Sequence, residues 1–337
     1  MMNELRRRPR IAAVALLLVA AMAWGSTFVI VKHAVSQAPV LDFLTWRFLL
    51  AGAILVVWRP RALSRLGWRG VCQGGALGLV LAAGYLLQTY GLEITPAAVS
   101  GFLTGLQVAF TPLIAWALLR HRPRGRTWAA ILVATGGLAL ITLRGISLGP
   151  GEVLTLGSAA AFALQLVGLG RWTSIEDAYG LATMQLLTVG VVCTVGAAPS
   201  GIGLPSSPGV WGAVALTAVA ATAFAFAAQT WAQSHLSATA AAVVFTTEPV
   251  FAALFAGLAG EHFGWTVLAG GGLVVAAMLV LGVTSGRDVT GRPAEMAAGM
   301  VAPPTPTSPA RCDATRAEPG SELTQARRNA GGAFREG

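Results

Sequence analysis

Apolar stretches separated by short polar breaks follow one another through residues 11–285. A helix needs about 20 apolar residues to cross a bilayer core of about 30 Å, and the stretches have that length. Pro60, Pro123 and Pro150 stand in the breaks, where proline readily ends a helix. The pattern predicts an all-α integral membrane protein with ten transmembrane helices, near residues 11–31, 39–58, 70–91, 96–119, 128–144, 150–170, 179–199, 209–232, 238–259 and 265–284.

The first of these spans has a basic start and an apolar middle, as a cleavable signal peptide does. The sequence Ala21-Met22-Ala23 also resembles a cleavage site. The apolar run nevertheless continues to Val31, which is longer than a signal-peptide core, and further spans follow. We therefore expect the first span to be retained as a transmembrane helix.

The composition supports a membrane protein and decides how the net charge is interpreted. Of the 337 residues, 55% are hydrophobic and 11% are charged, whereas roughly 25% of residues are charged in a soluble domain. The formal net charge of +9 comes from arginines in loops and in the C-terminal part, and no basic stripe lies along a predicted helix. We expect the lipid bilayer as a partner and no nucleic acid.

The arginines gather in every second loop, and this distribution sets the expected orientation. One set of loops contains the groups Arg6–Arg10, Arg59–Arg69 and Arg120–Arg126, whereas the other set carries only Lys32 and Arg144 near span ends. Short loops rich in Lys and Arg stay in the cytoplasm. The sequence therefore predicts a multi-pass protein of the bacterial plasma (inner) membrane with both termini cytoplasmic.

The C-terminal residues 286–337 differ in character from the rest. They contain Pro303, Pro304, Pro306 and Pro309, scattered charges and no apolar periodicity. Such a segment cannot bury enough apolar surface to fold. We predict a disordered cytoplasmic tail.

The chain also contains an internal repeat with an offset of 141 residues. Gln88-Thr89 recurs as Gln229-Thr230. Each half then holds five predicted spans, and because five is odd the halves are inverted relative to each other in the membrane. Inverted repeats are typical of secondary transporters, whose substrate site lies where the repeats meet. The same offset relates Ala97 to Ala238, Phe110 to Phe251, Leu113 to Leu254, Ala115 to Ala256 and His121 to His262.

Short motifs in four of the spans carry a resemblance to a known family. They are Trp24-Gly25-Ser26-Thr27-Phe28, Trp46-Arg47-Phe48, Gln229-Thr230-Trp231-Ala232-Gln233 and Thr247-Glu248-Pro249-Val250-Phe251, with Gly260-Glu261 after the last. These motifs resemble the EamA-type repeat of the drug/metabolite transporter superfamily. One departure is that Arg120-His121 replaces the Gly-Glu that often ends the fourth helix, so symmetric acids at the two loops are not expected.

The resemblance implies a fold and a function. We expect a first EamA-like repeat over residues 11–144 (helices 1–5) and a second over residues 150–285 (helices 6–10), with a central cavity between them. The resemblance further implies a secondary transporter, an exporter of small metabolites, amino acids or drug-like compounds, that works by alternating access. Its partners would be a small-molecule substrate and a coupling ion such as the proton, and a homodimer is left open.

Glu248 is the acidic residue that we place deep within a span. A charge near the bilayer centre is costly, by about 2.5–3.5 kcal/mol on insertion scales, so such an acid normally faces a cavity or a partner. We predict that Glu248 binds substrate or couples transport to an ion, while a structural acid beside Pro249 stays the alternative. Further cavity candidates are aromatic, hydroxyl and amide residues of the spans, namely Trp24, Ser26, Thr27, Gln88, Gln107 and Gln229.

Three other charged residues of the first two spans receive a structural interpretation. Lys32 is close enough to the span end to extend its ammonium group to the surface. Arg47 lies deeper, and we expect it to pair with Asp42.

The sequence lacks the residues that several other classes of function would need. No pair of the four histidines has the spacing of metal ligands, and no phosphate-cradling loop is present, so we predict no metal, no cofactor and no enzyme activity. An intramembrane enzyme would need a histidine at membrane depth, whereas all four lie outside the apolar cores. A membrane channel or a structural membrane subunit stays open as an alternative.

Overall fold

A computed structural model describes residues 2–119, 149–175, 177–205, 207–236 and 238–286, with a few isolated positions between residues 125 and 140. These residues belong to one compact unit, Met1–Gly291. The fifth predicted span, 128–144, lies outside the described residues except for the isolated positions, and so does the predicted tail beyond Gly286.

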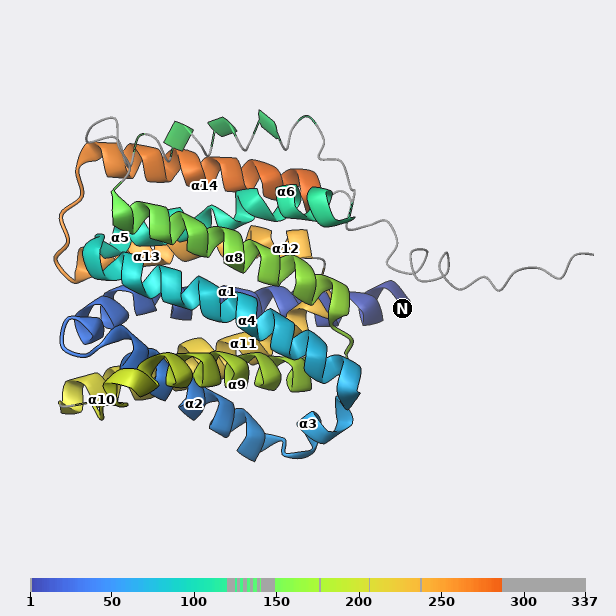
Figure 1. Ribbon diagram of the computed structural model, residues 1–337. Helices are drawn as coiled ribbons and strands as arrows, with labels where there is room; N and C mark the ends of the chain where they lie inside the picture. Colours follow the sequence, from blue (N-terminus) through green and yellow to red (C-terminus); the bar gives the residue numbers. More distant parts are fainter. Residues whose placement is uncertain are drawn as a thin grey trace, which may run out of the picture. The chain divides into compact units, whose positions relative to one another are not determined.

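The described residues form helices and contain no strand (Figure 1). The segments are α1 (Met2–Val35), α2 (Val40–Trp58), α3 (Arg61–Arg65), α4 (Gly67–Ile94), α5 (Ala97–Gly105), α6 (Gln107–Leu119), α8 (Pro150–Trp172), α9 (Ala178–Ala197), η1 (Ala198–Ser200), α10 (Pro208–Leu216), η2 (Thr217–Phe224), α11 (Ala225–Gln233), α12 (Ala238–Val244), η3 (Phe245–Thr247), α13 (Glu248–Leu258) and α14 (Trp265–Gly286).

These helices have the length and polarity of membrane spans. In the described part of the chain, 8 of them, counted with their direct continuations, are long and apolar enough to cross a membrane. Within α14, Trp265–Ala277 forms a shorter apolar helix. The predicted all-α membrane fold is confirmed.

Three predicted spans are not continuous α-helices. The fourth consists of α5 and α6 joined at Leu106, the eighth contains the π-helical η2, and the ninth contains the 3₁₀-helical η3. In the ninth, Pro249 has no N–H to offer, and the N–H of Glu248 donates to the carbonyl of Phe245 three residues back. Such local changes of winding are frequent at functional sites.

The packing of the helices repeats itself with the two halves exchanged. The offset of 141 residues relates α1 to α8, α2 to α9, α4 to the α10–α11 span, and the α5–α6 span to the α12–α13 span. The contact of α4 with α8 then corresponds to the contact of α11 with α1, and the contact of α1 with α13 corresponds to that of α8 with α6. The helix α2 packs on α9, its own counterpart. The described halves are therefore related by an approximate two-fold axis.

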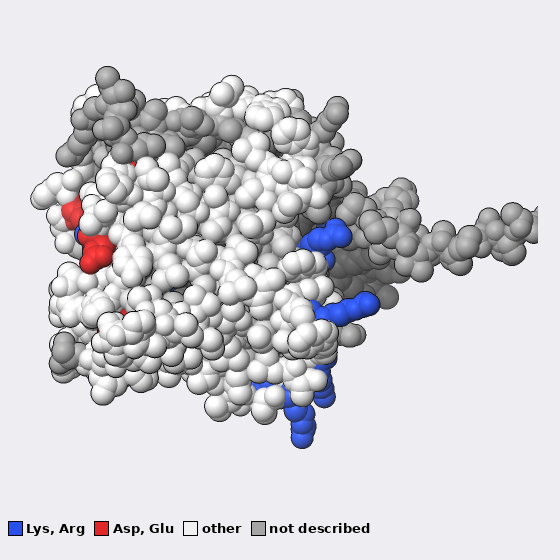
Figure 2. Space-filling model, viewed as in Figure 1, with Lys and Arg blue, Asp and Glu red and all other residues white. Residues whose placement is uncertain are grey.

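The two ends of the bundle differ in the predominant sign of their charged side chains (Figure 2). On α4, Arg69 is near the start and Glu93 near the end, whereas on α8 Glu152 is near the start and Arg171 near the end. Because Glu93 and Glu152 line the same cavity, the two helices run antiparallel and bring like charges together. Apart from Lys32 at the acidic end and the buried Arg47, the described Lys and Arg side chains thus occupy one end, and Glu93, Glu152 and Glu261 the other (Figure 2).

Candidate functional site

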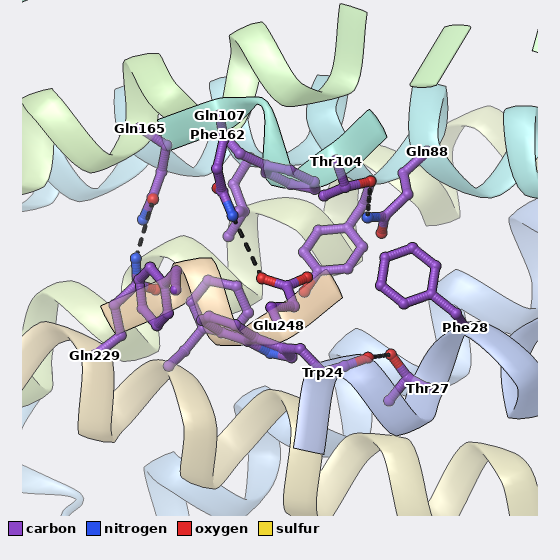
Figure 3. A pocket seen from close by; sticks show the side chains of 14 residues that line it. Trp24, Thr27, Phe28, Gln88, Thr104, Gln107, Phe162, Gln165, Gln229 and Glu248 are labelled. Atoms are coloured by element: carbon purple, nitrogen blue, oxygen red, sulfur yellow. Dashed lines mark hydrogen bonds between the residues drawn. The ribbon is translucent and has the colours of Figure 1, made fainter. Parts of the chain in front are cut away.

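A small cavity of about 40 Å³ lies in the middle of the helix bundle and is built by both halves of the chain. The lining residues come from α1, α4, α5, α6, α8, α11, η3 and α13, and they are Trp24, Thr27, Phe28, Leu81, Tyr85, Gln88, Thr104, Gln107, Phe162, Gln165, Phe226, Gln229, Phe245 and Glu248 (Figure 3).

Most of the lining residues are paired by the internal repeat. The pairs whose members are 141 residues apart are Trp24 with Gln165, Tyr85 with Phe226, Gln88 with Gln229, Thr104 with Phe245, and Gln107 with Glu248. The cavity therefore surrounds the approximate two-fold axis. Its two sides carry different chemistry at equivalent positions, so the site is symmetric in shape and asymmetric in polarity.

Glu248 and Gln107 face each other across this cavity (Figure 3). The Gln107 amide donates to Glu248 Oε2 at 3.3 Å. Both side chains are nearly buried, with 4% and 6% exposure. Glu248 is the first residue of α13 and Gln107 the first of α6. In the described part of the chain Gln107 is the only hydrogen-bond donor to this carboxylate and no ion pair reaches it.

Close packing of α1 against α13 sets the place of Glu248. A Cβ atom added to Gly25 would lie 2.5 Å from Cβ of Phe251 and 2.9 Å from the carbonyl oxygen of Glu248. Only glycine permits two helix backbones to approach in this way. Gly25 thereby brings the α13 backbone, with the acid at its first residue, directly against the α1 residues that line the cavity.

Aromatic rings form a connected wall around the carboxylate. Trp24 is 5.3 Å from Phe226 and 5.1 Å from Phe245, and Tyr85 is 5.3 Å from Phe162 and 6.1 Å from Phe226, all between ring centroids. Their tilted and edge-on arrangements are those that aromatic pairs prefer. The rings are therefore held by one another, and the wall is preorganised.

The π-helical segment η2 fixes the polar edge of this wall. The Trp24 indole N–H donates to the carbonyl oxygen of Ala221 at 2.6 Å. A neighbouring residue of the same segment, Thr222, accepts a hydrogen bond of 2.8 Å from Arg47 Nε. One irregular turn of helix thus orients both a cavity residue and the buried arginine behind the cavity.

A chain of glutamine side chains crosses the second half beside the cavity. Gln229 Nε2 donates to the Oε1 atoms of Gln165 and Gln233, and Gln165 Nε2 donates to Gln185 Oε1 at 2.7 Å. Gln185 and Gln233 complete the chain by donating to backbone carbonyls. These amides bind one another and backbone carbonyls, so the chain is a structural network in which Gln229 uses both of its N–H groups.

The expected pair of Asp42 and Arg47 is not formed. Arg47, 2% exposed, bonds to Thr222 and lies with its guanidinium carbon 5.0 Å from the Tyr85 ring centroid. Five residues separate it from Asp42, which places the two side chains about 140° apart around a helix of 3.6 residues per turn. Asp42 instead lies against Gly203. The interpretation of Arg47 and Asp42 as a helix-internal pair was wrong.

Lys32 lies at the acidic end and not in the central cavity. Its ammonium group donates to the carbonyl oxygens of Leu92 and Thr95 at the end of α4. Beside it, the Glu261 carboxylate accepts hydrogen bonds from the backbone N–H groups of Ala97 and Ala98 and so caps the start of α5. Acids at a helix start satisfy its free N–H groups. Glu261 therefore joins the two repeats at this end, whereas the hydrogen bonds of Lys32 stay within the first repeat.

The structure brings six of the predicted cavity residues together, namely Trp24, Thr27, Gln88, Gln107, Gln229 and Glu248. Ser26 does not line the cavity, and its hydroxyl donates to the Ala23 carbonyl on its own helix. The sequence interpretation missed the aromatic wall and Thr104. The repeat offset is a signal that identifies some of these residues. Tyr85 is equivalent to Phe226, and Thr104 is equivalent to Phe245.

Metal ligands do not gather in this structure. Among the described residues, no three His, Cys, Asp or Glu side chains lie in a group that could hold a metal ion.

Comparison with known proteins identifies the family of the chain. The profile of the EamA-like transporter family matches the chain twice, at residues 11–143 and 149–283. An "uncharacterized transporter" of Archaeoglobus fulgidus is 28% identical over 240 residues, which cover 71% of this chain and 75% of that protein. The "uncharacterized transporter YwfM" of Bacillus subtilis is 31% identical over 158 residues, covering 43% of this chain and 51% of that protein.

A solved crystal structure shares the fold. It has a TM-score of 0.63 and 17% sequence identity, and the match covers 82% of this chain and 98% of the other. At this identity the likeness is one of fold alone.

Proposed function

Because the chain belongs to the EamA-like transporter family, we propose that it is a secondary transporter that exports a small metabolite, amino acid or drug-like compound by alternating access. Relatives in the family carry the name transporter. The export direction, the substrate range and the coupling are our proposal.

The observation that carries the proposal is the contact of Gln107 with Glu248 in the central cavity. Alternating access needs a binding site near the axis that relates the inverted repeats, because both gates must reach it in turn. A buried carboxylate on that axis can bind a proton or a cation from one side and release it to the other. The single carboxylate at this pair also makes the two access routes chemically unequal.

The orientation follows from the distribution of charge. Arg59, Arg61, Arg65, Arg69 and Arg171 occupy one end of the bundle and Glu93, Glu152 and Glu261 the other. Basic loops face the cytoplasm, so we place the Arg-rich end and both termini in the cytoplasm of a bacterial cell. The acidic end then faces outward.

The experiment has two steps. Metabolites in the medium of cells with and without the gene are first compared, to identify an exported compound. The purified protein is then reconstituted into vesicles that are loaded with this compound, and uptake of its labelled form by counterflow is measured. Saturable counterflow that is lost in Glu248→Gln supports the transporter. Flux that does not saturate and shows no counterflow would identify a channel instead.

A further inference from the structure

The central cavity presents a negative charge that its own walls do not balance. Glu248 receives one hydrogen bond, from the uncharged amide of Gln107. Among the described residues that line the cavity, none is Lys, Arg or His. A nearly buried carboxylate is costly unless it is neutralised. The cavity therefore favours either a proton or a cationic group next to Glu248.

Arg47 lies behind the aromatic wall of the cavity and is not the cationic group next to Glu248. Its Nε is bonded to Thr222, and its guanidinium lies over the rings of Tyr85 and Phe48. Tyr85 lies between it and the cavity, within electrostatic reach of both Arg47 and Glu248. Arg47 and Tyr85 are the charged or titratable side chains that the described residues place near Glu248. Arg47 therefore leaves the cavity-facing side of Glu248 free for a ligand.

The rest of the wall also favours a cation. Trp24, Phe28, Tyr85, Phe162, Phe226 and Phe245 contribute six aromatic rings to the lining. The faces of such rings carry negative charge density and attract ammonium groups. Gln229 Oε1 is a buried acceptor without a partner in the described part of the chain. Rings, a carboxylate and an unpaired carbonyl are what a protonated amine with an apolar body would contact.

Among the residues described for the lining, the cavity offers an anion no cationic side chain. The winding changes near Glu248 and Gln107 could have exposed backbone N–H groups to an anion. The N–H of Glu248 is bonded to Phe245, however, and those of Ala109 and Phe110 are bonded to Leu106. The side-chain amides of Gln88, Gln107, Gln165 and Gln229 all donate within the protein.

We propose that the substrate class of the central cavity is a monovalent organic amine with an aromatic or similarly compact apolar body, held by Glu248 and the rings around it. This inference deepens the proposed function and rests on it. It selects amines against amino acids and carboxylates, whose carboxylate group would lie beside Glu248 without a cationic partner.

A charge series on one carbon skeleton tests the proposal. The probes are 2-phenylethylamine, phenylalanine, 3-phenylpropionate and the neutral 2-phenylethanol, and binding to the purified wild-type protein in lipid nanodiscs is measured for each. We expect the amine to bind at least about tenfold more tightly than phenylalanine or 3-phenylpropionate, because only the amine makes a charge-assisted contact with Glu248 without placing a second carboxylate in the cavity. Equal or tighter binding of phenylalanine or 3-phenylpropionate, or no binding of the amine, overturns the proposal.

A matched pair of variants ties the effect to the cavity. Glu248→Gln should weaken binding of the amine by roughly tenfold to hundredfold while binding of 2-phenylethanol is unchanged. The control Glu93→Gln removes an acid at the acidic end, outside this cavity, and should change neither. Unchanged amine binding in Glu248→Gln overturns the proposal. The wild-type charge series decides the matter by itself if this variant does not fold.

Counterflow in vesicles separates this inference from the transport function. Counterflow of phenylalanine would leave the transporter in place and overturn the substrate class. Selective binding of the amine without counterflow of any probe would support the substrate class and contradict transport.

Discussion

Gln107 and Glu248 occupy the same position in the two repeats, 141 residues apart, and they are hydrogen-bonded to each other at 3.3 Å. Two equivalent residues can touch only where the axis that relates their repeats passes between them. Each is also the first residue of the helix that follows a change of winding, α6 in one repeat and α13 in the other. The one carboxylate of the cavity is therefore placed on the symmetry axis, with an amide as its counterpart.

The first prediction exchanges these two residues. Glu248→Gln should abolish the pH dependence of transport, because the carboxylate that binds and releases the proton is gone. The double variant Gln107→Glu with Glu248→Gln returns a carboxylate to the same place from the other repeat, and we expect it to recover part of the pH-dependent transport in vesicles.

The single variant Gln107→Glu is the control for the exchange. It places two carboxylates within contact distance, and like charges at that distance do not both ionise, so its pH profile should differ from the wild type. A double variant as inactive as Glu248→Gln would show that the axial position is insufficient and that Glu248 acts through contacts specific to α13.

The second prediction concerns the contact of α1 with α13. Gly25→Ala places a methyl group 2.5 Å from Cβ of Phe251, so the helices must separate. Overpacking of this kind costs about 1–3 kcal/mol, and it also displaces the backbone of Glu248. We expect a lower melting temperature in detergent and reduced transport.

Gly75→Ala is the matched control for Gly25→Ala. Gly75 also lies within a helix, α4, and no atom would come within 4 Å of an added Cβ. Alanine is the better helix former, so this variant should melt no lower than the wild type. Equal stability and transport in both variants would contradict the importance of the close approach.

The third prediction concerns the buried arginine. Thr222→Val removes the hydroxyl that accepts the 2.8 Å hydrogen bond from Arg47 Nε. A buried charged donor without its acceptor costs about 1–3 kcal/mol. Unfolding in a denaturing detergent should therefore occur at a lower denaturant fraction. In the control Thr194→Val, the lost hydroxyl bonds only to Gly190 of its own helix, and little change is expected.

The fourth prediction concerns the acidic end. Glu261→Ala removes both acceptors for the N–H groups of Ala97 and Ala98. Loss of a helix cap costs about 0.5–2 kcal/mol, and because this cap joins the two repeats, we expect the outer gate to open more often. Accessibility of a cysteine introduced at Val99 to a thiol reagent added outside the cells would measure this opening, with Glu93→Ala as the control. Equal labelling in both variants would contradict a gate role for Glu261.

The fifth prediction concerns orientation. Reporter fusions after Arg65 and Arg124 should give cytoplasmic signals, and fusions near Gly203 should give external ones, because basic loops are retained in the cytoplasm. A cytoplasmic signal near Gly203 together with an external one at Arg65 would reverse the orientation and place the acidic end inside.

The sequence by itself determined the class of fold and the presence of the repeat. Membrane spans require long apolar stretches because backbone polar groups must bond within the helix in lipid, and this requirement is local. The offset of 141 residues is equally visible in Gln88-Thr89 and Gln229-Thr230. An acid such as Glu248 is conspicuous in an apolar span because its burial is costly.

Only the tertiary structure decided which side chains face the cavity. Rotation of one helix by less than half a turn decides whether Ser26 or Thr27 lines it, and all-round apolar helices carry no stripe that would fix this rotation. The partner of Arg47 was misjudged for the same reason, since Thr222 is 175 residues away and presented by a π-helical turn. The aromatic wall beyond Trp24 was likewise not predictable, because Phe226 and Phe245 look like ordinary core residues until the packing of α1, α11 and η3 brings their rings against Trp24.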